Sequence, residues 1–159
     1  MPAGTLDPAV EALVGYNGST YVRIDPKTGK VSNVGSISGG YQSSGDIVSV
    51  IGGDTLLTVK GGAKSCADCI VRVNPKTGDI IGTPDPIPFG SVFGLAFWAG
   101  IAYGFTDGGE IFSYDTVTQA TQTIPIPNKP SGLNFYGAGS TTCAPAHKPL
   151  SPVRGRSPA

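Results

Sequence analysis

One ten-residue stretch occurs three times along the chain, and this repeat limits the possible folds more than any other feature. The first copy is Tyr21-Val-Arg-Ile-Asp-Pro-Lys-Thr-Gly-Lys30, and the second is Ile70-Val-Arg-Val-Asn-Pro-Lys-Thr-Gly-Asp79. A third, more divergent copy is Ile111-Phe-Ser-Tyr-Asp-Thr-Val-Thr-Gln-Ala120. Similarity at a regular spacing is the signature of an architecture built from stacked copies of one small unit.

Each copy predicts a β-hairpin. The first four residues are mostly β-branched or aromatic, which favours a strand. Pro26 and Pro75 then fix the backbone for a turn, and Gly29 and Gly78 supply the left-handed residue that returns the chain. The third copy has Gln119 at the glycine position. Because a left-handed residue other than glycine costs about 1 kcal/mol, we expect the third turn to be the loosest.

A second pattern recurs between the hairpins. It is a short apolar strand rich in small residues, which suits close packing around a crowded axis, and it occurs at 44–50, 92–98 and 131–136. The first two are followed by another strand, at 55–59 and 101–105, and residues 12–16 take the equivalent place before the first hairpin. The unit is therefore four antiparallel strands, as in a β-propeller blade.

The number of units is too small for a closed ring. Residues 1–139 predict an all-β, propeller-like domain of about three four-stranded blades, with the inner strand missing from the first blade. Propellers typically close with four to eight blades. Either the chain is the C-terminal part of a longer propeller, or two copies form a six-bladed ring. We favour the first, because nothing specific in the sequence supports a self-complementary interface.

Residues 140–159 predict a disordered tail, because a polar stretch this rich in proline cannot bury enough surface to fold. The prolines concerned are Pro145, Pro149, Pro152 and Pro158. His147, the one histidine of the chain, lies among them, so we expect it to be exposed and without a catalytic role. A Ser-His-Asp triad would need this residue, which argues against serine hydrolase chemistry.

The charge balance and the apolar pattern exclude several partners. Eleven basic and eleven acidic side chains cancel, so the chain has no electrostatic footprint for nucleic acid. No apolar run reaches the roughly 18–20 residues of a membrane helix. The first residues lack the basic start and apolar middle of a signal peptide, so the sequence itself does not indicate a compartment.

Cys66-Ala-Asp-Cys69 is the one recognisable short motif, and it lies in an insertion before a strand. We predict a small disulfide, and rank free thiols, a metal site and a redox pair below it. A structural zinc site needs four ligands, and only Cys143 and His147 remain to complete one. A redox pair normally stands at the start of a helix, which this context lacks. We assign no metal and no cofactor.

Two residues of the inner strands are candidates for ligand binding. Asp46 begins a strand that would face the propeller axis, where a paired-carboxylate glycosidase could place an acid. A turn or capping role competes with that interpretation. Trp98 ends the next inner strand. We favour packing between blades over an exposed platform for a sugar ring.

The hairpin motif also carries a family resemblance. Tyr21–Gly29 resembles the outer hairpin of bacterial β-propeller repeats, with an aromatic or apolar strand followed by Asp-Pro-x-Thr-Gly, and the resemblance covers about residues 11–136. Residues 44–50, 66–69, 92–98 and 135–140 resemble uncharacterised secreted or lipoprotein propeller domains of myxobacteria. The resemblance implies a propeller fold and a parent protein that is secreted or held in the cell envelope, but no activity.

Two functions are compatible with these features. The first is a non-enzymatic repeat scaffold that binds a protein or glycan partner through loops at one end of the blades, and it needs no catalytic residue. The alternative is a fragment of a propeller enzyme, a hydrolase or lyase, whose catalytic residues lie partly in blades outside this chain.

Overall fold

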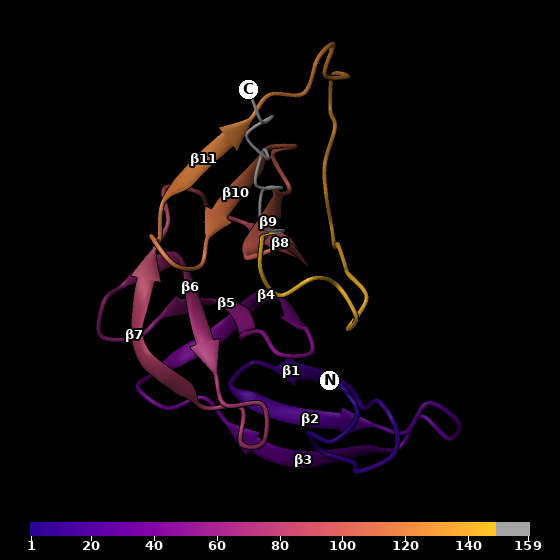
Figure 1. Cartoon of the computed structure of the whole chain (residues 1–159). Helices are drawn as coiled ribbons and strands as arrows, with labels where there is room; N and C mark the ends of the chain where they lie inside the picture. The colour runs from indigo at the N-terminus through magenta and orange to yellow at the C-terminus, as the bar shows by residue number, and fades with distance from the viewer. Residues whose placement is uncertain (149–159) are drawn as a thin grey trace, which may run out of the picture.

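The computed structural model describes residues 1–148, and this part of the chain folds into three antiparallel sheets with no helix (Figure 1). Sheet A contains β1 (Leu13–Asn17), β2 (Thr20–Ile24) and β3 (Val31–Ser36). Sheet B contains β4 (Tyr41–Ser49), β5 (Thr55–Gly61), β6 (Cys66–Val73) and β7 (Ile80–Pro86). Sheet C contains β8 (Val92–Trp98), β9 (Ile101–Thr106), β10 (Ile111–Asp115) and β11 (Thr121–Ile124).

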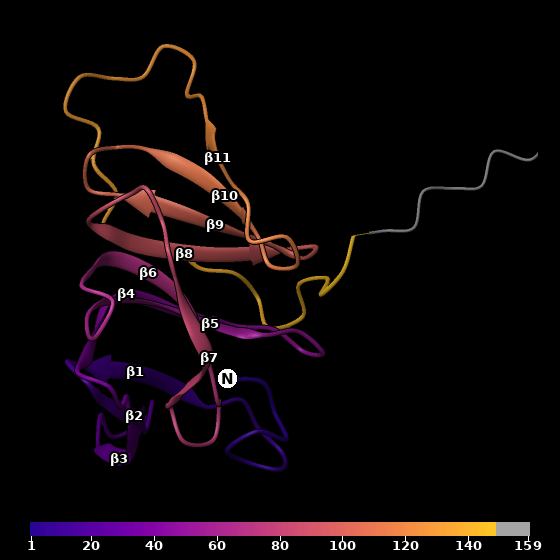
Figure 2. The same ribbon diagram turned by 90° about the vertical axis from the view of Figure 1, so that its left-hand side faces the viewer.

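Within each sheet the strands are neighbours in chain order, so every connection is a hairpin. Figure 2 shows the three sheets stacked one on another, with sheet B between the other two. The innermost strands of sheets B and C, β4 and β8, pack against each other. The result is an open, propeller-like arc, which confirms the predicted fold class, including the missing inner strand of the first unit.

Two apolar cores hold the sheets together, and sheet B contributes to both. Successive residues of a strand point to opposite faces, so Leu57 and Val71 face sheet A whereas Leu56 and Ile70 face sheet C. All four side chains are almost completely buried. Burial on both faces explains why these strands carry apolar residues without strict alternation.

The three hairpins share one turn geometry. Asp25, Asn74 and Asp115 each accept a backbone N–H from the residue two positions later, at 2.8, 2.9 and 2.9 Å. The residue four positions after each of them has a left-handed backbone, with φ of 70° at Gly29, 72° at Gly78 and 61° at Gln119. Gln119 therefore has the glycine conformation without the glycine, and the expectation that this turn is the loosest of the three stays a prediction.

The second hairpin also forms part of the boundary between sheets A and B. The hydroxyl of Tyr16 donates to the carbonyl of Gly78 at 2.6 Å, and that of Tyr21 donates to the carbonyl of Pro75 at 3.1 Å. Burial raises the pKa of Tyr21 to about 12, so this hydroxyl remains a donor over the whole neutral range. The turn of one unit is thus fixed by the strand of the unit before it.

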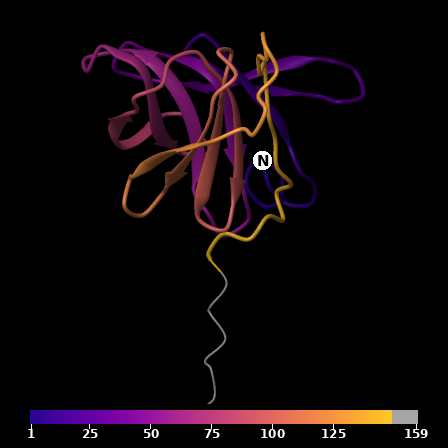
Figure 3. The ribbon, with the colours of Figure 1, turned by 90° about the horizontal axis from the view of Figure 1, so that it is seen from above.

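The C-terminal segment, residues 125–148, differs from expectation. Residues 131–136 do not form a strand, because no second strand lies beside them to complete a ladder. Residues 140–148, predicted as part of a disordered tail, instead pack on the sheets, with Ala144 buried and the carbonyl of Thr142 accepting the N–H of Ile51 at 2.8 Å. Figure 3 shows this yellow segment along one side of the stack. The remaining predicted tail, 149–159, lies outside the described residues.

Within residues 1–148, no helix is long and apolar enough to cross a membrane.

Two equivalent glycines provide a test of this packing. A Cβ at Gly78 would lie 2.5 Å from Cβ of Tyr21, whereas a Cβ at Gly29 would meet nothing within 4 Å. We predict that Gly29→Ala lowers the free energy of unfolding by about 1 kcal/mol, the cost of the left-handed backbone. Gly78→Ala should cost about 2–4 kcal/mol, because overpacking is added to the same backbone term. Urea denaturation measures both, and equal losses would contradict the packing of the second hairpin.

Candidate functional site

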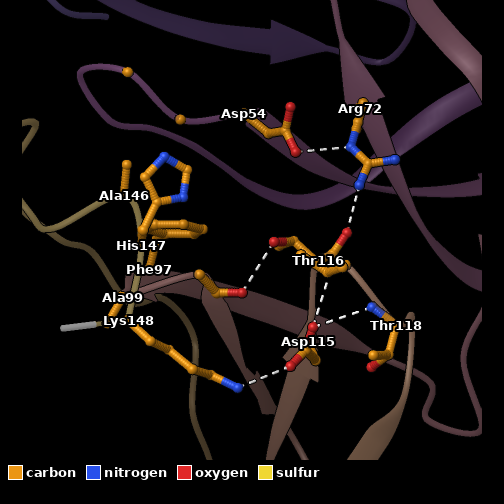
Figure 4. Close-up of a pocket in the computed structure, with 14 residues that line it drawn as sticks. Asp54, Arg72, Phe97, Ala99, Asp115, Thr116, Thr118, Ala146, His147 and Lys148 are labelled. Atoms are coloured by element: carbon orange, nitrogen blue, oxygen red, sulfur yellow. Dashed lines mark hydrogen bonds and ion pairs between the residues drawn. The ribbon is translucent and has the colours of Figure 1, made fainter. Parts of the chain in front are cut away.

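A groove of about 860 Å³ opens between sheets B and C, at the end of the strands where their turns lie. It is bordered by three turns and by the C-terminal segment (Figure 4). The turns are those between β4 and β5, between β8 and β9, and between β10 and β11, and the segment contributes residues 146–148. We call this the inter-sheet groove. Its volume exceeds the roughly 130 Å³ of a second pocket, which lies against Ile81, Gly82 and Asp85 of β7.

Arg72 of β6 links the two walls of the groove. Its Nε donates to Oδ2 of Asp54 at 2.7 Å, and its Nη2 donates to the carbonyl of Thr116 on the opposite wall. The hydrogen bond to Asp54 raises the pKa of the guanidinium further above neutrality. Thr116 is fixed in turn, since its Oγ1 donates to the carbonyl of Gly100 at 2.9 Å. The guanidinium therefore has a defined place and a permanent charge.

A second ion pair lies on the other side of the groove. Nζ of Lys148 is 3.1 Å from Oδ2 of Asp115. The pKa of Asp115 is lowered to about 2, first by hydrogen bonds from the backbone N–H groups of Thr118 and Val117 and then by Lys148. This carboxylate is therefore ionised at every physiological pH. It ties the C-terminal segment to the third hairpin.

The floor of the groove is apolar, and its charges balance. Phe97, Ala99 and Ala146 line it, with Phe97 almost fully buried. The two carboxylates are each paired with one cation, so the lining carries no net charge when His147 is neutral. His147 borders the opening and is exposed, as the sequence predicts.

Asp46, predicted as a ligand-binding residue, joins three parts of the chain instead of lining the groove. Its Oδ2 accepts the N–H of Leu95 at 3.3 Å and that of Ala138 at 2.9 Å. The carboxylate thus connects the inner strand of sheet B with that of sheet C and with the C-terminal segment. This arrangement supports the structural interpretation, and the ligand role stays a prediction.

Trp98, the other predicted ligand residue, lies at the end of β8 and is 54% exposed. It pairs with Ile101 across the ladder and points to the face opposite that of Phe97, away from the groove. Its role as a sugar platform also stays a prediction, and any such site would be separate from the groove.

The structure joins Cys66 and Cys69 in a disulfide, with Cα atoms 5.6 Å apart. Both sulfurs belong to the core between sheets A and B. Asp68, between them in sequence, is also buried, and its Oδ2 accepts the N–H of Val92 at 3.1 Å. Cys143 is free and exposed. Within residues 1–148, no three or more His, Cys, Asp or Glu side chains gather as a metal site would require.

The sequence did not point to the groove, although one signal for it exists. Arg72 occupies the same repeat position as Arg23, and each has an aspartate before it in sequence. The structure pairs Arg23 with Asp7 at 3.2 Å, as it pairs Arg72 with Asp54. The Arg–Asp pair thus recurs at the same repeat position, and at Arg72 it lies where sheet B meets sheet C. The Lys148 contact has no such signal.

Comparison with models of protein families gives a match. The model of a family described as "Repeat of unknown function (DUF6923)" matches residues 9–143. The matched range covers all three sheets and the C-terminal segment as far as Cys143. No curated protein matches the chain. The predicted repeat architecture agrees with this match, while the closer likeness to myxobacterial envelope proteins stays a prediction.

Removing one wall contact tests the electrostatics of the groove. We predict that Lys148→Ala raises the pKa of Asp115 from about 2 but leaves it below the ordinary value, because the two backbone N–H bonds remain. The carboxylate of Asp25 accepts the same two turn hydrogen bonds but has no contact with Lys148, so its pKa should not change. Carboxyl NMR titration measures both groups.

The sign of the pH effect follows from the lowered pKa. The Asp115 contacts stabilise the fold fully above the ordinary aspartate pKa of 3.8, and this stabilisation is lost as the pH falls through about 2. A wild-type pKa near 3.8, or no response to Lys148→Ala, would contradict the assigned contacts.

Thiol labelling tests the cysteine assignment. Without reductant, a maleimide probe should modify Cys143 and leave Cys66 and Cys69 unmodified, even in denaturant. After reduction in denaturant, all three cysteines should react. Modification of Cys66 or Cys69 in unreduced, denatured protein would show that the disulfide is absent from that preparation.

Proposed function

The chain belongs to the family described as a repeat of unknown function (DUF6923), and from that premise we propose that it is a non-enzymatic scaffold with a binding site in the inter-sheet groove. The ligand we propose is neutral and rich in hydroxyl groups, as a glycan segment is. The observation that carries the proposal is the groove itself, which combines an apolar floor with two internally balanced ion pairs.

Charge balance favours a neutral ligand over an ionic one. To pair with one of these side chains, a charged ligand would have to separate Arg72 from Asp54 or Lys148 from Asp115. The other member of the separated pair would then be left without a counter-charge. A sugar hydroxyl can donate a hydrogen bond to a carboxylate and accept one from the neighbouring cation, so it can bind both partners without breaking the ion pair. The volume of the groove lies within the range of about 300–1,000 Å³ typical of ligand sites.

The groove is also held in shape before any ligand arrives. Its walls are tight turns, and Arg72 and Thr116 fasten one wall to the other. A site that is ordered in the free protein avoids part of the entropic cost of binding. Such rigidity suits recognition of a flexible, weakly binding ligand.

The acidity of Asp115 supports binding rather than hydrolysis at this site. A glycosidase general acid must be protonated near the working pH, which requires a raised pKa. The pKa of Asp115 is lowered to about 2 instead. Asp115 is therefore suited to accept hydrogen bonds from hydroxyl groups and unsuited to donate a proton to a leaving group.

Two equivalent arginines make a matched pair of variants for the binding test. An array of neutral oligosaccharides identifies a binder, and isothermal titration then measures its dissociation constant for wild type, Arg72→Gln and Arg23→Gln. We predict at least a tenfold weaker affinity for Arg72→Gln, about 1.4 kcal/mol. Arg23→Gln, which alters the same repeat position outside the groove, should bind as wild type does.

Three results would contradict the proposal. They are an array without a binder, equal effects of the two variants, and binding only of charged glycans. Binding of a peptide in place of a glycan would keep the scaffold function and overturn the proposed ligand.

A further inference from the structure

The two ends of the arc expose sheet faces of complementary kinds. Tyr21 and Ile70 are the first residues of the first two copies of the repeat, and each side chain faces the sheet that comes next along the chain. Tyr21 lies against the second hairpin, in sheet B, and Ile70 packs against sheet C. Val71 and Phe112 are the second residues of the second and third copies, and each side chain faces the sheet that comes before its own along the chain. Each sheet therefore has a preceding face, which points to the sheet before it along the chain, and a following face, which points to the sheet after it. At both internal boundaries the following face of one sheet packs on the preceding face of the next.

The same alternation defines the two outer faces. On the preceding face of sheet A, Leu13, Ile24 and Val31 lie in one row across the three strands, with Leu13 52% and Val31 58% exposed. On the following face of sheet C, Trp98 and Ile101 lie beside each other. No sheet of residues 1–148 covers either face. On the following face of sheet C, Phe135 of the C-terminal segment packs edge-on against Phe105, and no sheet lies against the rest of that face. A further contact of the internal kind requires one uncovered preceding face and one uncovered following face.

The C-terminal segment supplies a second observation. A Cβ added to Gly45 of β4 would collide with the backbone of Val92 and Phe93, which begin the next inner strand. A Cβ added to Gly94 of β8 would collide in the same way with the backbone of Gly137 and Ala138. Gly137 and Ala138 therefore lie against β8 in the same way as the first residues of β8 lie against β4. The segment occupies the position of another inner strand.

This inner strand has no sheet, and sheet A has no inner strand. Strand β1 pairs only with β2 on one side, so its other edge is free among the described residues. Within one chain the segment reaches the neighbourhood of β1 only through a hydrogen bond from Thr142 to Glu11. An open strand edge and an unpaired extended segment are each liabilities that proteins normally cover.

We propose that a second copy of this chain covers both features. The following face of sheet C packs on the preceding face of sheet A of the other copy, and residues 135–141 of one copy pair with β1 of the other. The contact occurs twice, related by a two-fold axis, so the complete dimer interface is isologous and closes a ring. Rings of this type contain about four to eight sheets. Because each chain supplies three sheets, a ring of whole chains falls within that range with two copies.

The first experiment is light scattering on the full chain carrying Cys143→Ser, which removes the exposed thiol as a source of covalent dimers. We expect a dimer at micromolar concentration. Leu13→Lys with Val31→Lys should raise its dissociation constant at least 100-fold, because two charges enter the buried face. Ile81→Lys, an equally exposed aliphatic position of sheet B, should leave the dimer intact.

Circular dichroism keeps the result interpretable by showing that the lysine variants remain folded, since both replaced side chains are more than half exposed. A monomeric Cys143→Ser protein would overturn the proposal. A dimer that resists the double lysine variant equally would overturn it, because the association would then use another surface.

Hydrogen exchange tests the strand pairing separately. In the dimer, the β1 amides that β2 does not bind should exchange slowly, and in the folded double lysine monomer they should exchange at least tenfold faster. Equal exchange in the two states would show that residues 135–141 do not pair with β1. Glycan binding in the groove is a separate property, which the double lysine variant should retain.

Discussion

The need to bury two apolar faces determines the arrangement of this chain. A sheet that carries apolar side chains on both sides is stable only between two neighbours. Sheet B has both, and its central strands β5 and β6 are enclosed on both faces, with Leu57, Val59 and Thr58 fully buried. Sheets A and C each have one neighbour. Their folding therefore depends on sheet B, and their outer faces are where the chain still has apolar surface to cover.

The inner edge of the arc presents a second requirement, because edge strands leave backbone groups without partners. From Leu95 of β8 to Ala99 just after it, every second N–H has a partner outside sheet C. Leu95 donates to Asp46, Phe97 donates to Oγ of Ser140 at 3.1 Å, and Ala99 donates to the carbonyl of Pro145 at 2.7 Å. The C-terminal segment thus satisfies the edge and, a few residues later, forms one wall of the inter-sheet groove. Edge protection and the candidate binding site are consequences of the same path of the chain.

The repeat allowed most of the fold to be predicted, since local turn chemistry and strand composition act within each unit. The hairpins, their left-handed residues including Gln119, and the strand order follow from residues close in sequence. The groove does not. Arg72 reaches Thr116, 44 positions away, and Lys148 reaches Asp115 from a stretch whose composition indicated disorder. The proline-rich composition predicts little helix or strand, but it does not forbid an extended segment from packing once an unpaired edge is available. Asp46 was singled out because of its place near the axis, and that place is occupied by backbone N–H groups.

Native-state hydrogen exchange on dilute protein tests most directly the claim that two-sided burial organises the molecule. If sheet B is the one sheet covered on both faces within a chain, the amides of β5 and β6 should exchange last, through global unfolding only. Amides of β2 and β10 should exchange earlier, through partial opening of the end sheets. Exchange in β2 or β10 that is as slow as in β5 and β6 would contradict this account, because the end sheets would then be stable without a second neighbour.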